Sequence, residues 1–481
     1  MFSLEPIHDW ADEPGEFVSW EPSATSLAKA AEAPVSEVPV SYQQAQHLRA
    51  YREHTARGTQ MARLTIPAWN IQGRCDIRLM THVINAYLRR HDTYRSWFEF
   101  VDGPDGEDVV RRTLRSPKDI KYVATNRGVC TPDQWRDFVL STPSPMEWGC
   151  FRFGIIQRPD HFTFFMTVDH VHVDAMYLGL AFVEIHMMYV QLAAGGAPIP
   201  LPEAGSYADY CVRQRKFTSA LTVDSPQVRG WMEFTDRNNG TLPKFPLPLG
   251  DPSVPCEGDL MTVHLMDAEQ SDRFESACTD AGARFLGGIF AAAAIAEHEL
   301  TGNPSYNVIT PTSTRDSQAE MMTTGWFTGT VPVTVEVTPE SFAATVRSAQ
   351  SAFDSGLPLA HVPFERVLEL AGDHGVRKPD PGVPMISYMD ATLAPLSSSV
   401  VGEWDTLNGK IFSEMGAANQ IGMWFNRFHH GTSVTLAFPN NPIALESVTR
   451  YTEAMKAVFA RVAAGRGELA PVGDLVDLRT A

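Results

Sequence analysis

The sequence predicts an α+β protein built from two similar lobes. In each half of the chain, long apolar helical segments are mixed with short apolar runs typical of a mostly antiparallel set of strands. Between the halves lies an irregular, proline-rich stretch, as expected of a crossover connection. We therefore expect an extended N-terminal arm over 1–40, a first lobe over 41–200, the crossover over 201–259 and a second lobe over 260–481.

Composition excludes several classes of protein. The 481 residues are 44% hydrophobic and 20% charged, which provides ample material for a core, and the net charge of −18 argues against a nucleic-acid partner. Six scattered cysteines without a C-x-x-C pair are typical of a reducing cytoplasm. The N-terminus lacks the apolar core of a secretory signal, and the apolar run Ile289–Ala296 is too short to span a bilayer. We expect a monomeric cytoplasmic protein whose membrane contact, if it has one, is peripheral at the inner face.

Helix-start signals and spacing predict the elements of the first half. Ser41 is the expected N-cap of a helix that begins at Tyr42 and ends near Arg57. A second helix over Asp76–His91 places its apolar residues on one face. The other expected elements are strands over Leu64–Trp69, Tyr94–Val101, Phe151–Gln157 and Phe162–Val168, a short helix begun by Thr131-Pro132, and a helix over Tyr207–Phe217 within the crossover.

One stretch, Phe162–Tyr189, organises the first half. Its first seven residues are apolar or Thr, which is typical of a strand buried on both faces. The polar corner Asp169-His170-Val171-His172-Val173-Asp174 follows. An apolar helix then runs to a stop at Ala194-Gly195-Gly196. The predicted buried face of this helix consists of Met176, Leu180, Val183, Met187 and Val190. Ionisable groups at such a corner are costly to bury, which indicates a structural or chemical role.

The residues of the corner admit three interpretations. In the first, Asp174 caps the helix and both histidines are satisfied in the core or at its rim. In the second, His170, His172 and Asp174 hold a metal ion, since H-x-H-x-D resembles the zinc motif of metallo-β-lactamases, although Ala175 stands where that motif has a further His. In the third, His170 is a general base that removes a proton from a substrate hydroxyl, and Asp174 keeps the corner rigid.

The second half repeats the mixture of helices and strands. Its expected elements are strands over Leu260–Leu265, Tyr306–Pro311, Phe327–Val337, Met385–Met389, Gln420–Phe428 and Ser433–Phe438, and helices over Asp267–Ala281 and Phe285–Leu300, after Pro339, after Pro363 and over Ala444–Ala464.

Other motifs with known chemistry are absent or weak. The chain has no G-x-S-x-G elbow, no G-x-G-x-x-G and no Walker loop, so a serine hydrolase, a Rossmann dehydrogenase and a P-loop enzyme lose their main support. Cys150 lies in an apolar strand and is better explained as core than as a nucleophile. Arg315 follows a predicted strand, and by itself it is explained as a surface residue paired with Asp316.

The corner resembles the H-H-x-x-x-D-G motif of the condensation-domain and CoA-dependent acyltransferase superfamily. Further landmarks resemble that superfamily in the same order along nearly the whole chain. They are Pro39–Gln46 (P-L-S-x-x-Q), Arg90–Arg95 (R-H-E-x-L-R), Gly325–Pro332 (the G-x-F-x-N-x-x-P latch) and Phe438–Pro442, which leads into the last helix. More narrowly, the phrases DWADEPGEFVSWEPS, SYQQAQHLR and RRHDTYRSWFEF resemble the polyketide-associated acyltransferases that acylate trehalose during assembly of mycobacterial cell-envelope glycolipids.

The resemblance implies two chloramphenicol-acetyltransferase-like lobes that form a pseudo-dimer, with the active site in a channel between them. It implies that His170 takes the proton from a trehalose hydroxyl as that oxygen attacks the thioester of an acyl-CoA or of an acyl chain bound to a polyketide synthase. Asp174 completes the site, and Arg315 is implied as its structural partner across the lobe interface. No cofactor, metal or acyl-enzyme is expected. A contact with a lipid transporter is compatible with this role.

Three departures from the family pattern affect the expected site. Asp169 replaces the first His of the motif, Ala175 replaces its Gly, and Gly329 stands where the latch often has Asn. The donor that stabilises the oxyanion is therefore open among the Ala175 N–H, Ser387 and Asn426. Two other functions also stay open, a zinc-dependent hydrolase that uses His170, His172 and Asp174, and a non-catalytic lipid-binding member of the fold.

Overall fold

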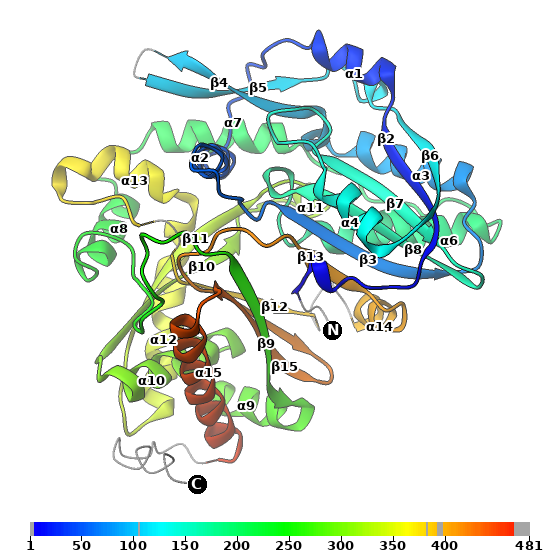
Figure 1. Ribbon diagram of the computed structural model, residues 1–481. Coiled ribbons are helices and arrows are strands. Elements are labelled where there is room, and N and C mark those ends of the chain that lie inside the picture. Colours follow the sequence, from blue (N-terminus) through cyan, green and yellow to red (C-terminus); the bar gives the residue numbers. More distant parts are fainter. Residues whose placement is uncertain (1–3, 104–105, 381–382, 392–397, 466–481) are drawn as a thin grey trace. The chain divides into compact units, whose positions relative to one another are not determined.

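The computed structural model describes residues 4–103, 106–380, 383–391 and 398–465 (Figure 1). Its contacts divide the chain into two compact units, and each unit combines one large sheet with helices. Unit 1 consists of Met1–Ala220, Ser313–Thr328 and Pro395–Gly416, and unit 2 consists of Leu221–Thr312, Gly329–Ala394 and Ala417–Ala481. These boundaries differ from the expected lobes, because two segments of the second half belong to unit 1.

Unit 1 is built on a seven-stranded sheet with the strand order β1-β13-β3-β8-β7-β2-β6. The neighbours are antiparallel except for the parallel pair β1 and β13. A separate hairpin is formed by β4 and β5. The strands are β1 (Leu4–Pro6), β2 (Gly15–Pro22), β3 (Leu64–Gln72), β4 (Ser96–Gly103), β5 (Gly106–Thr113), β6 (Tyr122–Cys130), β7 (Phe151–Gln157), β8 (His161–Asp169) and β13 (Lys410–Ser413).

The predicted buried strand is confirmed in β8, which lies between β3 and β7 and is buried at every residue after His161. Successive side chains of a strand point to opposite faces of the sheet, and both faces are covered here. Phe165 packs edge-on against Trp10 at 5.3 Å between ring centroids, whereas Phe164 packs against Trp69 at 4.8 Å. The strand that leads into the corner is therefore packed on both faces.

Helices of unit 1 begin largely where the sequence predicts. Ser41 caps α2 in a reciprocal capping box with Gln44, and Asp76 caps α3. The helices are α1 (Ala24–Ala31), α2 (Tyr42–Ala56), α3 (Ile77–Arg90), α4 (Pro132–Leu140), α5 (Tyr177–Ala181), α6 (Met188–Ala193), α7 (Tyr207–Ser219), α11 (Gln318–Met321) and α14 (Ser398–Thr406).

The helix after the corner differs from its predicted pattern. A π-helical stretch over Phe182–Met187 separates α5 from α6, and this insertion rotates the later residues about the helix axis. Val190, predicted on the buried face, is 43% exposed, whereas Glu184 is buried. The predicted face is therefore wrong after Leu180, because a wider helical turn carries a different set of side chains inward.

The first forty residues also differ from the expected extended arm. β2 pairs with both β6 and β7, so it is an internal strand of the sheet, and α1 follows it directly. Trp10 and Trp20 are 2% and 0% exposed, so both indoles anchor this segment in the core of the unit. β2 was missed because Glu16, Ser19 and Glu21 interrupt its apolar residues, and because its partners β6 and β7 are distant in the sequence.

Unit 2 is built on a six-stranded sheet with the order β11-β10-β12-β14-β15-β9. β12 is parallel to both β10 and β14, and β15 is antiparallel to both β14 and β9. The strands are β9 (Gly258–Asp267), β10 (Ser305–Ser313), β11 (Thr328–Glu336), β12 (Met385–Asp390), β14 (Gly422–Phe428) and β15 (Gly431–Pro439). The helices are α8 (Pro226–Asp236), α9 (Ala268–Asp280), α10 (Phe285–Thr301), α12 (Phe342–Gly356), α13 (Phe364–Ala371) and α15 (Pro442–Ala463).

The core of unit 2 surrounds α10, in which the consecutive residues Ile289–Ala296 are almost fully buried. α10 packs against α9, α12 and α15. No single helix in the described ranges is long and apolar enough to cross a membrane. α9 and α10 meet that criterion only jointly, and they are bent by 95° at the break between them.

Candidate active site

The polar corner follows β8 as a 3₁₀ turn over His170–His172. Asp169 caps the turn by accepting a hydrogen bond from the Val171 N–H at 3.0 Å. The backbone N–H of His170 donates to the Arg63 carbonyl on the neighbouring chain segment at 2.7 Å. These bonds hold the backbone so that the His170 side chain is half-buried while Val171 and His172 are buried.

Asp169, which replaces the first His of the family motif, is fully buried, and both of its carboxylate oxygens accept hydrogen bonds. Its carboxylate accepts from His47 Nε2 at 2.8 Å and from Arg63 Nη1 at 2.8 Å. Burial alone would raise the pKa of Asp169, but the charges and hydrogen bonds of His47 and Arg63 outweigh it and lower the pKa to about 2. Asp169 is therefore an ionised anchor that joins α2, the start of β3 and the corner.

The His170 imidazole has few polar neighbours. Its Nδ1 is buried and has no hydrogen-bond partner among the residues that the structure describes. The closest ring is the Trp326 indole, 4.3 Å away between centroids, and His47 lies 6.3 Å away. Burial and the proximity of His47 lower the pKa of His170, against smaller opposing effects of its own backbone, Asp169 and Asp174. A lowered pKa keeps the ring neutral near pH 7, the form that a general base requires.

His172 lies in a different environment from His170. Its ring packs among Tyr94, Phe98 and Phe151, and its Nδ1 lies 3.0 Å from Thr93 Oγ1. Burial lowers the pKa of His172 to about 4. His172 is therefore a neutral core histidine, but its Nε2 is buried without a hydrogen-bond partner among the described residues, so it is not satisfied as the first interpretation expected.

Asp174 forms a bidentate ion pair with Arg315, at 2.7 Å from Nη1 to Oδ2 and 3.0 Å from Nη2 to Oδ1. Both side chains are buried, with 6% and 1% of their surface exposed. The carboxylate also accepts from the backbone N–H groups of Phe327 and Met176. Arg315 was expected to cross a lobe interface, but both partners belong to unit 1, since Ser313–Thr328 is part of it.

Every donor of Arg315 has an acceptor. Besides Asp174, its guanidinium donates to the carbonyls of Glu320 and Thr323 and to Ser313 Oγ, and it lies 4.4 Å from the centroid of the Phe327 ring. The planar fork of arginine suits such a bidentate, stacked position. Arg315 therefore ties the corner to the segment that precedes and contains the latch.

The latch segment Gly325-Trp326-Phe327-Thr328 is held closely. A Cβ on Gly325 would lie 2.4 Å from the Tyr207 ring, so no larger residue fits without a shift. The Tyr207 hydroxyl lies 3.3 Å from the Trp326 carbonyl, and Gln43 donates to the Thr328 carbonyl at 2.5 Å. These contacts fix the backbone that presents Trp326 to His170.

Helix α2 supports the corner through side-chain hydrogen bonds. Gln44 completes the capping box with Ser41, donates to the Val171 carbonyl at 2.9 Å and accepts from the buried Arg111 at 2.8 Å. One turn further on, His47 reaches Asp169. The S-x-x-Q segment noted in the sequence is thus the start of a helix whose side chains hydrogen-bond to the corner.

Sequence reasoning missed three residues of this site, His47, Arg63 and Trp326. His47 had a usable signal, since it follows Ser41 and Gln44 at the same three-residue spacing on one helix. Trp326 stood inside the latch motif at a position without a predicted role. No local pattern pointed to Arg63, whose contact with Asp169 joins residues 106 positions apart.

The three oxyanion candidates lie in different places. Ala175 is exposed in the turn that leads into the five-residue helix α5. Ser387 and Asn426 lie on β12 and β14 of unit 2.

Cys150, the other residue considered as a nucleophile, is fully buried, and burial raises its pKa well above the usual range. All six cysteines are free thiols. A thiol that resists ionisation is a poor nucleophile, so Cys150 is a core residue.

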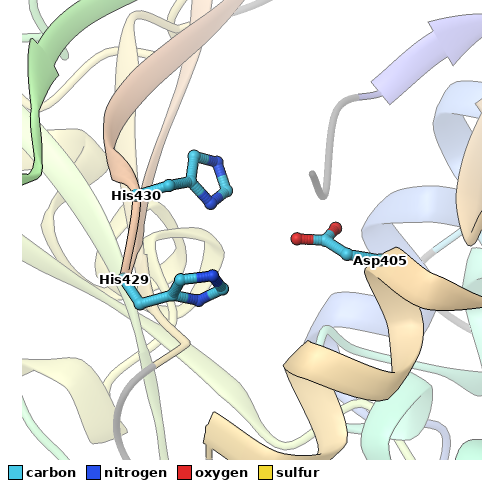
Figure 2. Close-up of side chains that lie close together, drawn as sticks. All are labelled: Asp405, His429 and His430. Carbon is cyan, nitrogen blue, oxygen red and sulfur yellow. The ribbon is translucent and has the colours of Figure 1, made fainter.

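The zinc interpretation has weak geometric support. Asp174 is committed to Arg315, and His172 faces Thr93 and aromatic rings. Among the described residues, His170, His172 and Asp174 do not gather as a set of metal ligands. Figure 2 shows another histidine pair, His429 and His430, at the turn between β14 and β15 of unit 2, together with Asp405 on α14 of unit 1. Neither unit contains all three of these residues.

Comparison with known proteins identifies similar chains. The family model described as "Condensation domain" matches residues 65–379. The chain is 52% identical over 466 residues to the trehalose-2-sulfate acyltransferase PapA2 of Mycobacterium tuberculosis, a match that covers 97% of this chain and 98% of PapA2. It is 50% identical over 461 residues to the acyltransferase PapA3 of the same organism, covering 96% and 97%. The solved structure "PapA2 acyl transferase" is similar with a TM-score of 0.92 and 53% identity, over 96% of this chain and 100% of that one.

Proposed function

The chain belongs to the condensation-domain family and, within it, to the Pap acyltransferases, and on this basis we propose that it acylates a hydroxyl of trehalose or of a trehalose derivative. It is an O-acyltransferase. The donor is a long-chain thioester, either an acyl-CoA or an acyl chain carried by a polyketide synthase. The trehalose acceptor is proposed by analogy with PapA2, whose name states its action on trehalose-2-sulfate.

In the proposed reaction, His170 Nε2 accepts the proton of the sugar hydroxyl as its oxygen attacks the thioester carbonyl. The new C–O bond gives a tetrahedral oxyanion. When this collapses, the C–S bond breaks, and the proton passes from the imidazolium to the sulfur of the leaving thiol. The products are a sugar ester and a free thiol, and no covalent enzyme intermediate forms. General-base catalysis of this kind contributes about 10²–10⁴-fold.

One observation carries the proposal, namely the contrast between the two imidazoles of the corner. His170 is half-buried, whereas His172 is sealed among aromatic rings. Asp169 and Asp174 are both committed to basic partners, so neither carboxylate is available as the base. His170 is therefore the group of the corner best suited to take a proton from a substrate.

In this proposal Asp174 acts through structure. Its pair with Arg315 and its bond to the Phe327 N–H keep the corner and the latch together. A buried ion pair of this type fixes geometry more than it adds stability. Asp174 therefore belongs to the site but does not contact the reacting atoms.

Purified protein provides the direct test. The protein is incubated with trehalose, trehalose-2-sulfate or an acylated trehalose, together with a series of acyl-CoAs of increasing chain length, and the products are read by mass spectrometry. We expect a trehalose ester and free CoA in at least one combination, with no loss of activity in EDTA. Loss of activity on chelation, with recovery on adding zinc, would support the hydrolase interpretation instead.

A further inference from the structure

The indole of Trp326 lies beside the proposed base, and the proposed function assigns it no task. It packs against the His170 imidazole at 4.3 Å between centroids and meets His47 edge-on at 5.5 Å. We propose that Trp326 is a specificity-determining residue, the surface on which one pyranose ring of the acceptor stacks while His170 takes the proton of its hydroxyl. This inference rests on the proposed function and names the feature of the same site that selects a sugar.

The indole is rigidly presented. Its neighbour Phe327 donates a backbone hydrogen bond to Asp174, the Trp326 carbonyl lies near the Tyr207 hydroxyl, and Gly325 is pressed against the Tyr207 ring. Thr328 on the other side is held by Gln43. A binding surface that is fixed before the ligand arrives loses little freedom on binding, which favours affinity.

The indole is also open to a ligand. Trp326 is half-buried, while Gly325 and Phe327 on either side are buried. Within the described ranges, its Nε1–H makes no hydrogen bond and is not fully buried. Indole N–H groups usually find a partner when buried, so an accessible one beside an active site is available to a ligand oxygen.

A sugar fits both features of this surface. A pyranose ring carries C–H groups on its faces and hydroxyls at its edge, so a face can lie on the apolar indole while an edge oxygen accepts from Nε1–H. Binding sites for small molecules combine such apolar walls with a few placed polar groups. The hydrocarbon part of an acyl donor also fits the apolar face of the indole, but it has no acceptor for Nε1–H.

The distance between the two rings allows one ligand to reach both. The attacking hydroxyl has to come within about 2.6–3.2 Å of the base. Because the indole and imidazole centroids are 4.3 Å apart, a pyranose ring that carries this hydroxyl is long enough to contact Trp326. The acceptor is therefore able to stack on the indole while its hydroxyl meets His170.

Two variants of Trp326 test the proposal. Trp326→Leu removes the aromatic face and the N–H, and Trp326→Phe keeps a smaller face without the N–H. Phe100→Leu, a half-buried aromatic on the separate β4–β5 hairpin, serves as the matched control. For each protein we measure KM and kcat for trehalose, and the rate at which the thioester is hydrolysed when no sugar is present. Circular dichroism melts check that all variants are folded.

We expect Trp326→Leu to raise KM for trehalose by about 5- to 50-fold, the range that losing an aromatic contact and a hydrogen bond represents. Trp326→Phe falls between Leu and the wild type, and in both variants the change in KM for trehalose is larger than the change in thioester hydrolysis without sugar. An unchanged KM for trehalose in Trp326→Leu would overturn the proposal. The proposal would also be overturned if the rates of acyl transfer and of thioester hydrolysis fell equally while KM for trehalose stayed constant. That result would mean that the indole affects only His170 and does not bind the sugar.

Direct binding separates this inference from the proposed function. Calorimetric titration with trehalose is performed on the wild type, on Trp326→Leu and on His170→Gln. Weaker binding by Trp326→Leu together with retained binding by His170→Gln supports stacking even if no trehalose ester is formed, in which case only the proposed function fails. Equal affinity of the wild type and Trp326→Leu, or no binding by either, contradicts the stacking proposal.

Discussion

At the scale of single residues, the buried pair Asp174–Arg315 has the clearest consequence for stability. Arg315→Ala leaves an unpaired carboxylate that is 6% exposed, and breaking such a pair costs about 3–5 kcal/mol. Asp174→Ala leaves an unpaired guanidinium and has a similar cost. Arg315→Lys keeps the positive charge but loses the bidentate guanidinium, so its free energy of unfolding lies between those of Arg315→Ala and the wild type. The measurement is the free energy of unfolding in urea.

An exposed pair provides the matched control. Arg229 and Asp224 form an ion pair in which both side chains are mostly exposed, so Arg229→Ala changes stability by at most about 1 kcal/mol. Equal, small effects of Arg315→Ala and Arg229→Ala would contradict the structural role of the buried pair.

His172 predicts how stability depends on pH. Its pKa is about 4 in the folded protein and about 6.5 when unfolded, so between these values the unfolded chain binds the extra proton. Stability from this residue is present above pH 6.5 and is lost as pH falls toward 4, by about 2 kcal/mol between pH 7 and pH 5. Burial lowers the pKa of His186 to about 4 as well, which adds a loss of the same sign.

Comparing a variant with the wild type isolates the contribution of His172 to the pH dependence of stability. Urea unfolding of the wild type and of His172→Gln is compared at pH 7 and pH 5, with the exposed His82→Gln as control. His172→Gln should lose less stability than the wild type over this interval, and His82→Gln should match the wild type. If His172→Gln loses as much stability as the wild type between pH 7 and pH 5, then the loss does not arise from His172.

How well single residues were predicted depends on whether a family motif assigns them a role. His170, Asp174 and Arg315 were named from motifs, and the structure joins Asp174 to Arg315 across 141 positions, although within unit 1 and not across a lobe interface. His47, Arg63 and Trp326 were assigned no role, because no motif position marks their contacts with distant parts of the chain. A pattern read along the chain carries the identity of a residue and not its tertiary partner.

At the scale of elements, the start of α2 is the support on which the corner rests. Gln44 is fully buried, and it satisfies the Ser41 N–H, the Val171 carbonyl and the buried Arg111. Gln44→Ala leaves these groups without that partner, at a cost of about 2–4 kcal/mol, and should also lower activity through His170. Gln46→Ala, exposed on the same helix, should change neither. Thermal melts and acyl-transfer rates check both variants, and equal behaviour of the two would contradict this role.

Elements with strong local signals were predicted well. The β7 strand, the capped helices α2 and α3 and the buried strand β8 occur where periodicity and caps place them. The π-helical insertion after Ala181 was not predictable from helix propensity. Its buried Glu184 bonds to Arg90 and His91, contacts with a distant segment that a local pattern does not show. β2 was missed for a related reason, because its pairing on both sides outweighs a weak strand pattern.

At the scale of the whole molecule, the chain returns twice to unit 1. β13 lies between β1 and β3, and Phe412 stacks on Trp10 at 4.8 Å. The segment Ser313–Thr328 supplies Arg315 and Trp326. The expected division into an early and a late lobe follows chain order, and the structure departs from it where these two segments join the first sheet.

A fragment tests this arrangement. Residues 1–220 alone lack β13, Phe412 and Arg315, so β3 has an open edge and Asp174 is buried without its partner. We expect this fragment to show no cooperative thermal transition and to aggregate, in contrast to the full chain. A cooperative melt and a dispersed NMR spectrum from the fragment would contradict the account of unit 1.

The account as a whole depends on His170 acting as the base of a direct acyl transfer. The most direct measurement is the single-turnover rate of ester formation by His170→Gln and the wild type with the same acyl thioester and trehalose acceptor, with His82→Gln as a surface control and circular dichroism as the check on folding. We predict that His170→Gln is folded and slower by about 10²–10⁴-fold, while His82→Gln keeps the wild-type rate. A folded His170→Gln that forms ester at the wild-type rate would contradict the central claim.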